Sequence, residues 1–323
     1  MRVPRDNPTV LPCALSSLSA LVAAAGIATC AACAGCDAQR SGVPKVVRSF
    51  GQSGGGPAEF LYPRAIDRAA DGTLWVIDKT GRVQHLDTAG NHLGGFAMPQ
   101  TDTGKPTGFT IAPDGDLYIA DTHYHRVMVY SPAGKLLRQF GSLGQGPGQF
   151  VYPTDVAFAP DGRVLVSEYG GNDRVSVFTA EGKFLASFGS PGEGPGQFSR
   201  PSALQVDAAR GRLYVADACN HRIAVYDLQG NCRGYFGSLG REAGQLRYPY
   251  GLALMHDGRL VVCEFGNNRI QVFDPAGRSL AVLGGPGRQL GELAFPWAVA
   301  VDDRGLAYIV DAGNNRVQVW ELP

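Results

Sequence analysis

The sequence predicts an all-β fold, a six-bladed β-propeller with four antiparallel strands in each blade. Three observations lead to this prediction: a unit that recurs six times, short strand-like segments within each unit, and chain ends that complement each other. Each unit opens with a proline, and successive prolines are 43, 47, 48, 48 and 47 residues apart, at Pro63, Pro106, Pro153, Pro201, Pro249 and Pro296. A repeat of this length is typical of a propeller blade.

The third unit illustrates the strand pattern. Its apolar or alternating segments predict short strands at residues 156–158, 164–168, 174–178 and 184–188. Between the first two lies the turn Pro160-Asp161-Gly162, because proline presets φ and glycine accepts a positive φ. No unit shows a sustained helical period.

The chain ends predict how the ring closes. The last unit stops at residues 320–323, after its third strand. Residues 45–51 resemble residues 135–141, which form the fourth strand of a complete unit. We therefore expect residues 45–51 to complete the C-terminal blade, which also protects strand edges that would otherwise invite aggregation.

The linkers between units repeat as well. Residues 141–150 resemble residues 189–198, weaker copies begin at Gly51, Gly237 and Gly284, and residues 96–105 depart from the pattern. The glycines resemble those of a phosphate-binding loop, but no helix follows to present its N-terminus to a phosphate. The repetition instead predicts a connector from the outer edge of one blade to the centre of the next.

Each unit also carries an acid, a loop and then an arginine followed by valine or isoleucine. These motifs are Asp121…His125-Arg126-Val127, Glu168…Asp173-Arg174-Val175, Asp217…His221-Arg222-Ile223, Glu264…Asn268-Arg269-Ile270, Asp311…Asn315-Arg316-Val317 and a shortened Asp78…Gly81-Arg82-Val83. They resemble the NHL repeat, and the resemblance extends from Lys45 to the end of the chain. It implies a six-bladed NHL propeller but not an activity, because this family mixes binding modules with a few enzymes.

A charged pair that recurs in every blade indicates a structural role. We expect each acid to accept backbone N–H groups of the loop that follows it, and each arginine to bridge that loop or the next blade.

The first 36 residues predict an export signal. Arg2 and Arg5 precede a small-residue apolar stretch at 11–29 and a cluster of cysteines. Ala34-Gly35-Cys36 resembles the cleavage box of bacterial lipoproteins, which implies lipidation of Cys36, with Cys33 as the alternative. Residues 37–44 would then tether the propeller at 45–323 to a membrane, and the protein would be exported to the periplasm or cell surface. An uncleaved anchor is the alternative for the apolar stretch.

Charge argues against nucleic acid as a partner. The chain has 29 basic and 29 acidic residues, and removing Arg2, Arg5 and Asp6 with the signal leaves 27 and 28. A nearly neutral domain lacks the positive field that draws proteins to nucleic acid. We expect a monomeric propeller whose only membrane contact is its N-terminal lipid.

Three cysteines remain in the propeller. Cys219 and Cys232 fall at opposite ends of a predicted strand, about 20 Å apart, which is too far for a disulfide. Cys219 and Cys263 fall at the same end, so the sequence leaves open either this pair or three free thiols.

The first strand of each blade is expected to line the central channel. The second residue after each proline is small in five units, and only Asp155 is charged there. Asp155 could help to hold a structural calcium ion, the one cofactor considered. The alternative, which we favour, is a carboxylate bonded to neighbouring backbone.

The residues that flank each proline are expected to form a rim around one channel mouth. They vary between units and are rich in arginine and aromatic residues, which dominate binding sites. Arg64, Tyr250 and Trp297 are the principal ligand-binding candidates. The further candidates are Lys105, Thr107, Thr154 and Arg200.

An enzymatic function is the alternative. Resemblance to the amidating-lyase branch of these propellers would imply a channel zinc held by histidines after the opening prolines, and no unit has one there. A lactonase-like propeller would need several acidic or amide ligands, of which only Asp155 is visible. With no catalytic residues identified, we predict a non-catalytic propeller that binds a protein, peptide or glycan at the channel mouth.

Overall fold

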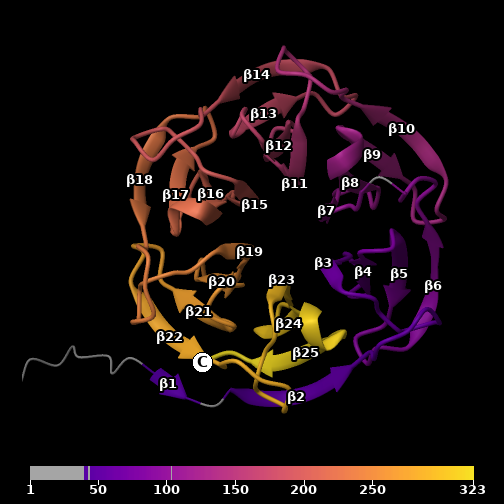
Figure 1. The fold of residues 1–323 in the computed structure, drawn as a ribbon, viewed down its shortest axis with the longest axis vertical. Helices are drawn as coiled ribbons and strands as arrows, with labels where there is room; N and C mark the ends of the chain where they lie inside the picture. The colour runs from indigo at the N-terminus through magenta and orange to yellow at the C-terminus, as the bar shows by residue number, and fades with distance from the viewer. Residues whose placement is uncertain (1–39, 43, 103) are drawn as a thin grey trace, which may run out of the picture. The chain divides into compact units, whose positions relative to one another are not determined.

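The computed structural model describes residues 40–42, 44–102 and 104–323. The predicted signal, with Cys33 and Cys36, lies outside the described residues. The described residues include no helix of the length and apolarity that crossing a membrane requires. They form six sheets arranged in a ring, as the sequence predicts (Figure 1).

The first three blades each contain four antiparallel strands in sequence order from the channel outward. Blade 1 comprises β3 (Pro63–Arg68), β4 (Leu74–Asp78), β5 (Arg82–Leu86) and β6 (His92–Ala97). Blade 2 comprises β7 (Gly108–Ile111), β8 (Leu117–Asp121), β9 (Arg126–Tyr130) and β10 (Leu136–Phe140). Blade 3 comprises β11 (Tyr152–Phe158), β12 (Val164–Tyr169), β13 (Arg174–Phe178) and β14 (Phe184–Phe188).

Blades 4 and 5 follow the same order, whereas the outermost strand of blade 6 comes from the N-terminal part of the chain. Short 3-10 helices replace one loop each in blades 2, 4 and 6. Blade 4 comprises β15 (Pro201–Asp207), β16 (Arg212–Asp217), β17 (Arg222–Asp227) and β18 (Cys232–Phe236). Blade 5 comprises β19 (Pro249–Leu254), β20 (Leu260–Glu264), β21 (Arg269–Phe273) and β22 (Ser279–Leu283). Blade 6 comprises β23 (Pro296–Val301), β24 (Leu306–Asp311), β25 (Arg316–Glu321) and β2 (Lys45–Phe50). The 3-10 turns are η1 (Thr122–Tyr124), η2 (Ala218–Asn220) and η3 (Ala312–Asn314).

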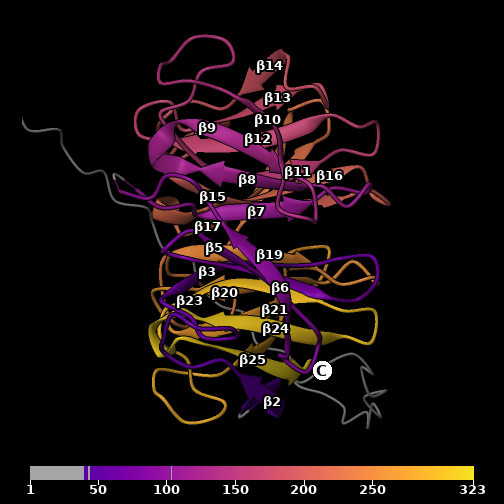
Figure 2. The same cartoon turned by 90° about the vertical axis from the view of Figure 1, so that its right-hand side faces the viewer.

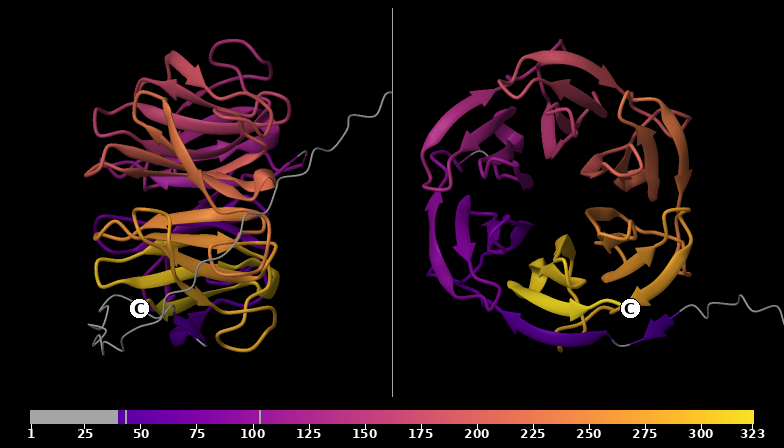
Figure 3. Two further views of the ribbon diagram at one scale, coloured as in Figure 1. Left: turned by 90° about the vertical axis from the view of Figure 1, so that its left-hand side faces the viewer. Right: turned by 180° about the vertical axis from the view of Figure 1, so that it is seen from behind.

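The ring closes as predicted, through the N-terminal strand β2. This strand pairs antiparallel with β25, from Lys45 opposite Glu321 to Phe50 opposite Val317 (Figure 3). Just before it, β1 (Arg40–Gly42) runs parallel to β22 and adds a fifth strand to blade 5. The segment predicted as a tether, 37–44, thus contains a strand.

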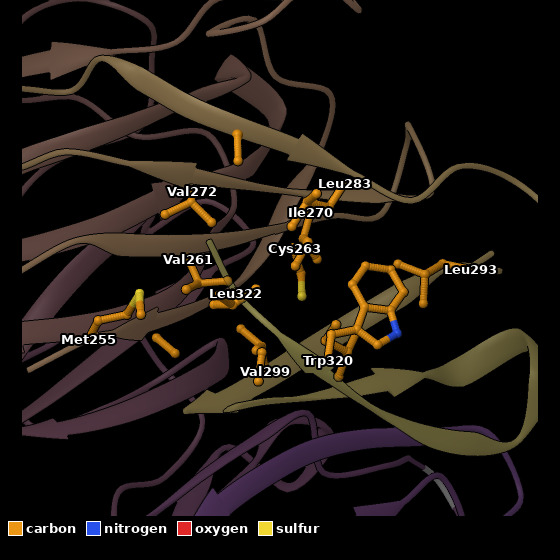
Figure 4. Packing of buried hydrophobic residues seen from close by; sticks show 14 residues of the cluster. Met255, Val261, Cys263, Ile270, Val272, Leu283, Leu293, Val299, Trp320 and Leu322 are labelled. Atoms are coloured by element: carbon orange, nitrogen blue, oxygen red, sulfur yellow. The ribbon is translucent and has the colours of Figure 1, made fainter. Parts of the chain in front are cut away.

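The hydrophobic core is divided among the six interfaces between neighbouring blades. Between blades 5 and 6, for example, the fully buried Trp320 packs with Cys263 and Leu293 (Figure 4). Val46 of β2 packs against the same cluster, so closure buries apolar surface as well as a strand edge.

The repeated linkers are connectors that fold back on themselves. In five of them a short parallel bridge joins start to end, as in Leu143 opposite Phe150. The last bridged residue is always fully buried, namely Phe60, Phe150, Phe198, Leu246 and Leu293. Each linker leads from an outer strand to the next inner strand (Figure 1).

The recurring acid and arginine form an ion pair in every blade. In blade 4 Arg222 Nε donates to Asp217 Oδ2 at 2.7 Å, and Arg222 Nη2 donates to the linker carbonyl of Gln197 at 3.0 Å. The acid also accepts the N–H of Ser199 at 2.7 Å. The acid therefore accepts backbone N–H groups, as expected. In five blades, however, this N–H belongs to the end of the preceding linker, where the chain enters the first strand of the same blade.

Candidate functional site

The first strands of the six blades enclose a central cavity with a volume of about 720 Å³. Strand β3 and its five equivalents contribute residues along their length to the lining of this cavity. The strands run between the two loop-bearing faces of the ring (Figure 2). The residue after the opening proline lines the cavity in five blades, namely Arg64, Thr107, Ser202, Tyr250 and Trp297. These positions define the channel mouth.

Three consecutive blades carry a hydroxyl residue at this position, and the hydroxyl joins each blade to the next. Thr107 Oγ1 donates to the carbonyl of Thr154 at 3.1 Å, and Thr154 Oγ1 donates to that of Pro201 at 2.7 Å. Ser202 Oγ continues the chain to the carbonyl of Pro249 at 3.0 Å. Thr154 is only 5% exposed. The structure thus gives Thr107 and Thr154, two of the predicted ligand contacts, a structural use.

The other three blades carry large side chains that form one array with Arg200. The guanidinium carbon of Arg64 lies 4.9 Å from the ring centroid of Trp297, whose ring lies 5.0 Å from that of Tyr250. The guanidinium carbon of Arg200 lies 5.5 Å from the centroid of the Tyr250 ring. Phe265 adds a ring 4.8 Å from Tyr250. The sequence did not identify Phe265, because it follows the second strand rather than the proline.

Of the seven predicted ligand-binding residues, Arg64, Arg200, Tyr250 and Trp297 come together in this way. We call these four residues the mouth cluster. Lys105 is used elsewhere, since its ammonium group donates to the carbonyl of Thr101 at 2.9 Å.

Backbone strain positions the residues before the prolines. Four of them adopt a left-handed conformation that is unfavourable before proline: Tyr62 (φ 54°), Arg200 (φ 58°), Tyr248 (φ 49°) and Phe295 (φ 53°). Their N–H groups are held by side chains of the preceding blade, respectively by Asn315 Oδ1, Asp173 Oδ1, His221 Nδ1 and Asn268 Oδ1. This explains the recurring Asn, His or Asp before each arginine, because these residues tolerate the left-handed conformation and offer a hydrogen-bond acceptor.

The two arginines of the mouth cluster lack an acidic partner. Among the described residues, neither Arg64 nor Arg200 takes part in an ion pair. The Nε atom of Arg64 is buried and has no hydrogen-bond partner. Burial lowers the pKa of Arg64 and the like charge of Arg200 lowers it further, whereas burial raises the pKa of Tyr250.

Two carboxylates lie deeper in the channel. Asp155 Oδ2 accepts the N–H of Leu204 in the next blade at 2.9 Å, and Asp67 Oδ2 accepts that of Ile111 at 2.8 Å. Desolvation by the surrounding protein raises the pKa of Asp155 to about 7 and that of Asp67 to about 6. Asp67 lies four residues after its proline. The sequence singled out only the second residue after each proline, which is the position of Asp155, and so did not identify Asp67.

The described residues do not fit the zinc site of a lyase-like propeller. They contain no group of three His, Cys, Asp or Glu side chains placed to hold a metal ion. His221 uses Nδ1 to accept the N–H of Tyr248, and His125 Nδ1 bonds the carbonyl of Val151. Asp155 is bonded to backbone, and it belongs to no such group that could hold calcium. Cys219, Cys232 and Cys263 are free thiols.

Comparisons with known sequences identify the repeat. The NHL repeat model matches residues 103–130, 246–273 and 293–320, and the six-bladed beta-propeller model DUF5128 matches residues 156–234. Among curated proteins, the Drosophila melanogaster protein brain tumor is 30% identical over 77 residues, covering 24% of this chain and 7% of that protein. The rat peptidylglycine alpha-amidating monooxygenase is 29% identical over 116 residues, covering 31% of this chain and 12% of that protein.

Similar solved structures support the fold. A Staphylococcus aureus virginiamycin B lyase matches with a TM-score of 0.59 at 16% identity, over 85% of this chain and 99% of that one. A Bacteroides thetaiotaomicron protein of unknown function matches with a TM-score of 0.63 at 16% identity, over 86% and 74%. At these identities the likeness concerns architecture and not activity.

Proposed function

Because the chain is a six-bladed β-propeller built from NHL repeats, we propose that it is a non-catalytic binding protein whose ligand docks on the mouth cluster. Propellers of this kind present variable side chains on a rigid frame. The ligand is a protein, peptide or glycan, and the propeller acts as a monomer.

We further propose that the protein works at the cell envelope. The N-terminal pattern of basic residues, apolar stretch and cysteines supports export, and the Ala-Gly-Cys36 sequence supports lipidation there, or at Cys33. The propeller would then face its ligand from a membrane-attached position.

One observation carries the binding proposal. At the position after the opening proline, three blades use a hydroxyl that joins neighbouring blades. The other three use Arg64, Tyr250 and Trp297, which are half-buried and line the cavity. A small hydroxyl residue serves the fold at this position in three blades. Trp297 packs in part against the core between blades 6 and 1, and all three large side chains keep exposed surface that a ligand can contact. Arginine, tyrosine and tryptophan are also the residues that contribute most to binding.

Capture of ligands from envelope extracts tests the proposal. We expect the immobilised propeller to retain a ligand. The double variant Tyr250→Ala/Trp297→Ala should lose the ligand while remaining folded, as measured by its circular dichroism and a cooperative thermal transition. The matched control is Lys183→Ala/Leu185→Ala, which alters exposed residues of blade 3. Equal capture by wild type and the mouth variant would refute the proposal.

A metal-dependent propeller enzyme, amidating-lyase-like or lactonase-like, remains the second candidate. Asp155 and Asp67 favour it, because a carboxyl group with a raised pKa is suited to proton transfer. Metal analysis of the purified protein separates the candidates. We expect no stoichiometric zinc, and finding one zinc per chain would favour the enzyme.

A further inference from the structure

The charge of the mouth cluster indicates what kind of ligand it accepts. Arg64 and Arg200 bring two positive charges to one end of a channel, and no described carboxylate forms an ion pair with either. Each of the six blade-motif arginines, by contrast, pairs with a fully buried acid of its own blade. The protein therefore neutralises its structural guanidinium groups and leaves these two unneutralised.

The surroundings of Arg64 make this arrangement costly without a ligand. Its guanidinium lies 4.9 Å from the ring of Trp297 and 6.0 Å from that of Tyr62, and its Nε atom is buried without a partner. Aromatic faces attract a cation but do not replace the hydrogen bonds that burial removes. An anion that accepts from the guanidinium would supply them.

The order of the groups defines the geometry of the site. Arg64 lies 4.9 Å from the ring of Trp297, this ring lies 5.0 Å from that of Tyr250, and Arg200 lies 5.5 Å from the Tyr250 ring. The two guanidinium groups are close enough for the charge of Arg200 to lower the pKa of Arg64. Arg200 also lies 4.8 Å from the ring of Tyr169. The site thus offers two positive charges beside the flat rings of Tyr250 and Trp297.

We propose that the mouth cluster binds an anionic group carried on a six-membered ring, with the anion held by Arg64 and Arg200 and the ring packed on Tyr250 and Trp297. This inference rests on the proposed binding function and specifies its ligand. A uronic-acid residue of a glycan and an aromatic carboxylic acid share this chemistry. A guanidinium group can bind a carboxylate through two parallel hydrogen bonds.

The size and charge of the channel favour a single ring over a polyanion. A volume of about 720 Å³ is within the range of sites for small molecules. Asp155 and Asp67 lie on the channel wall, and once ionised they repel an anion that passes beyond the mouth. A nucleic acid would require a broad positive surface, which this nearly neutral chain lacks.

Tryptophan fluorescence provides a direct test. The chain has three tryptophans, of which Trp75 and Trp320 are 3% and 0% exposed, so Trp297 is the one that a ligand can contact. The probes are glucuronate and 4-hydroxybenzoate, each compared with its neutral methyl ester. We expect at least one acid to change the fluorescence saturably and its ester to bind at least tenfold more weakly. Binding of glucuronate would identify the ligand as a uronic acid, and binding of 4-hydroxybenzoate would identify it as an aromatic carboxylic acid.

Charge-removing variants complete the test. Arg64→Gln and Arg200→Gln should each weaken the acid at least tenfold, and Arg64→Lys should recover part of the loss. Arg304→Gln is the matched control, because Arg304 is exposed in the turn after β23, at the far end of the channel. Acid and ester of equal affinity, no response to either acid, or unchanged binding by both glutamine variants would overturn the inference. None of these results affects the proposed function, which is tested by whether wild type captures an envelope ligand that the Tyr250→Ala/Trp297→Ala variant fails to capture.

Discussion

At the scale of single residues, the protein uses arginine in two ways. In the blade motif the guanidinium joins a buried acid to linker carbonyls, as Arg269 does with Glu264 at 2.5 Å and the carbonyl of Gln245 at 3.0 Å. At the channel mouth the guanidinium groups of Arg64 and Arg200 have aromatic neighbours, and no described acid forms an ion pair with either. The sequence places both kinds at fixed positions in the repeat, and only the contacts distinguish structural support from ligand recognition.

Blade 5 offers a comparison of a buried and an exposed arginine. Arg269→Ala removes the partner of a fully buried carboxylate, so we expect it to lower the free energy of unfolding by about 3–5 kcal/mol. Arg278→Ala breaks an ion pair whose arginine is 82% exposed and should cost less than about 1 kcal/mol. Urea unfolding of both variants measures the difference, and equal losses would contradict the structural role of the motif.

The channel carboxylates predict a pH dependence of stability. The folded protein raises the pKa of Asp155 from 3.8 to about 7, so between these values the native state keeps a proton that the unfolded chain has lost. Stability from this group is fully present below about pH 4 and is lost as the pH rises through 7. Asp67 contributes in the same direction up to about pH 6.

Asp155→Asn should remove most of this dependence. Because Asp155 is only half-buried and keeps some contact with channel water, we expect the variant to gain about 2 kcal/mol relative to wild type between pH 5 and pH 8. Urea unfolding at the two pH values gives this number. A wild type and variant with the same pH slope would show that Asp155 titrates normally.

At the scale of elements, the blades depend on how each strand is entered. The acid at the end of the second strand accepts a backbone N–H at the entry to its own blade. The Asn, His or Asp of the following loop accepts one at the entry to the next blade. These bonds fix the start of the inner strand and, with it, the mouth residue. The rim is rigid because the repeat motif holds it in place.

Because β2 closes the ring, deleting this short strand should lower the stability of the whole propeller more than the loss of six residues elsewhere would. Deleting residues 45–50 removes the fourth strand of blade 6 and exposes the edge of β25 along with part of two core clusters. We expect the melting temperature to fall by more than about 10 °C. Deleting residues 40–42, which form the additional strand β1, is the control and should have a much smaller effect. Similar melting temperatures for all three proteins would contradict closure by β2.

The sequence could predict most of this level of organisation. The period, the strand pattern and the incomplete last unit determine the blade number and the closure. The sequence could not predict that the acid bonds the preceding linker, because that contact depends on how neighbouring blades pack. Nor could it separate Thr107 and Thr154 from Arg64, or find Phe265 and Asp67, since these distinctions depend on distances across the channel.

At the scale of the whole molecule, six similar blades build a frame that is nearly symmetric, and the mouth residues break that symmetry. Hydroxyl residues join blades 2 to 5, whereas Arg64, Tyr250 and Trp297 gather from blades 1, 5 and 6 with Arg200 from the entry to blade 4. This asymmetry directs a ligand to one side of the opening.

Hydrogen exchange of the propeller with its captured envelope ligand tests the central claim most directly. The account predicts that ligand slows exchange in the segments around the mouth, residues 62–66, 199–203, 248–252 and 295–299, and leaves the turns at the other end of the channel unchanged. Protection confined to those far turns, or to the outer strands, would contradict recognition at the mouth cluster.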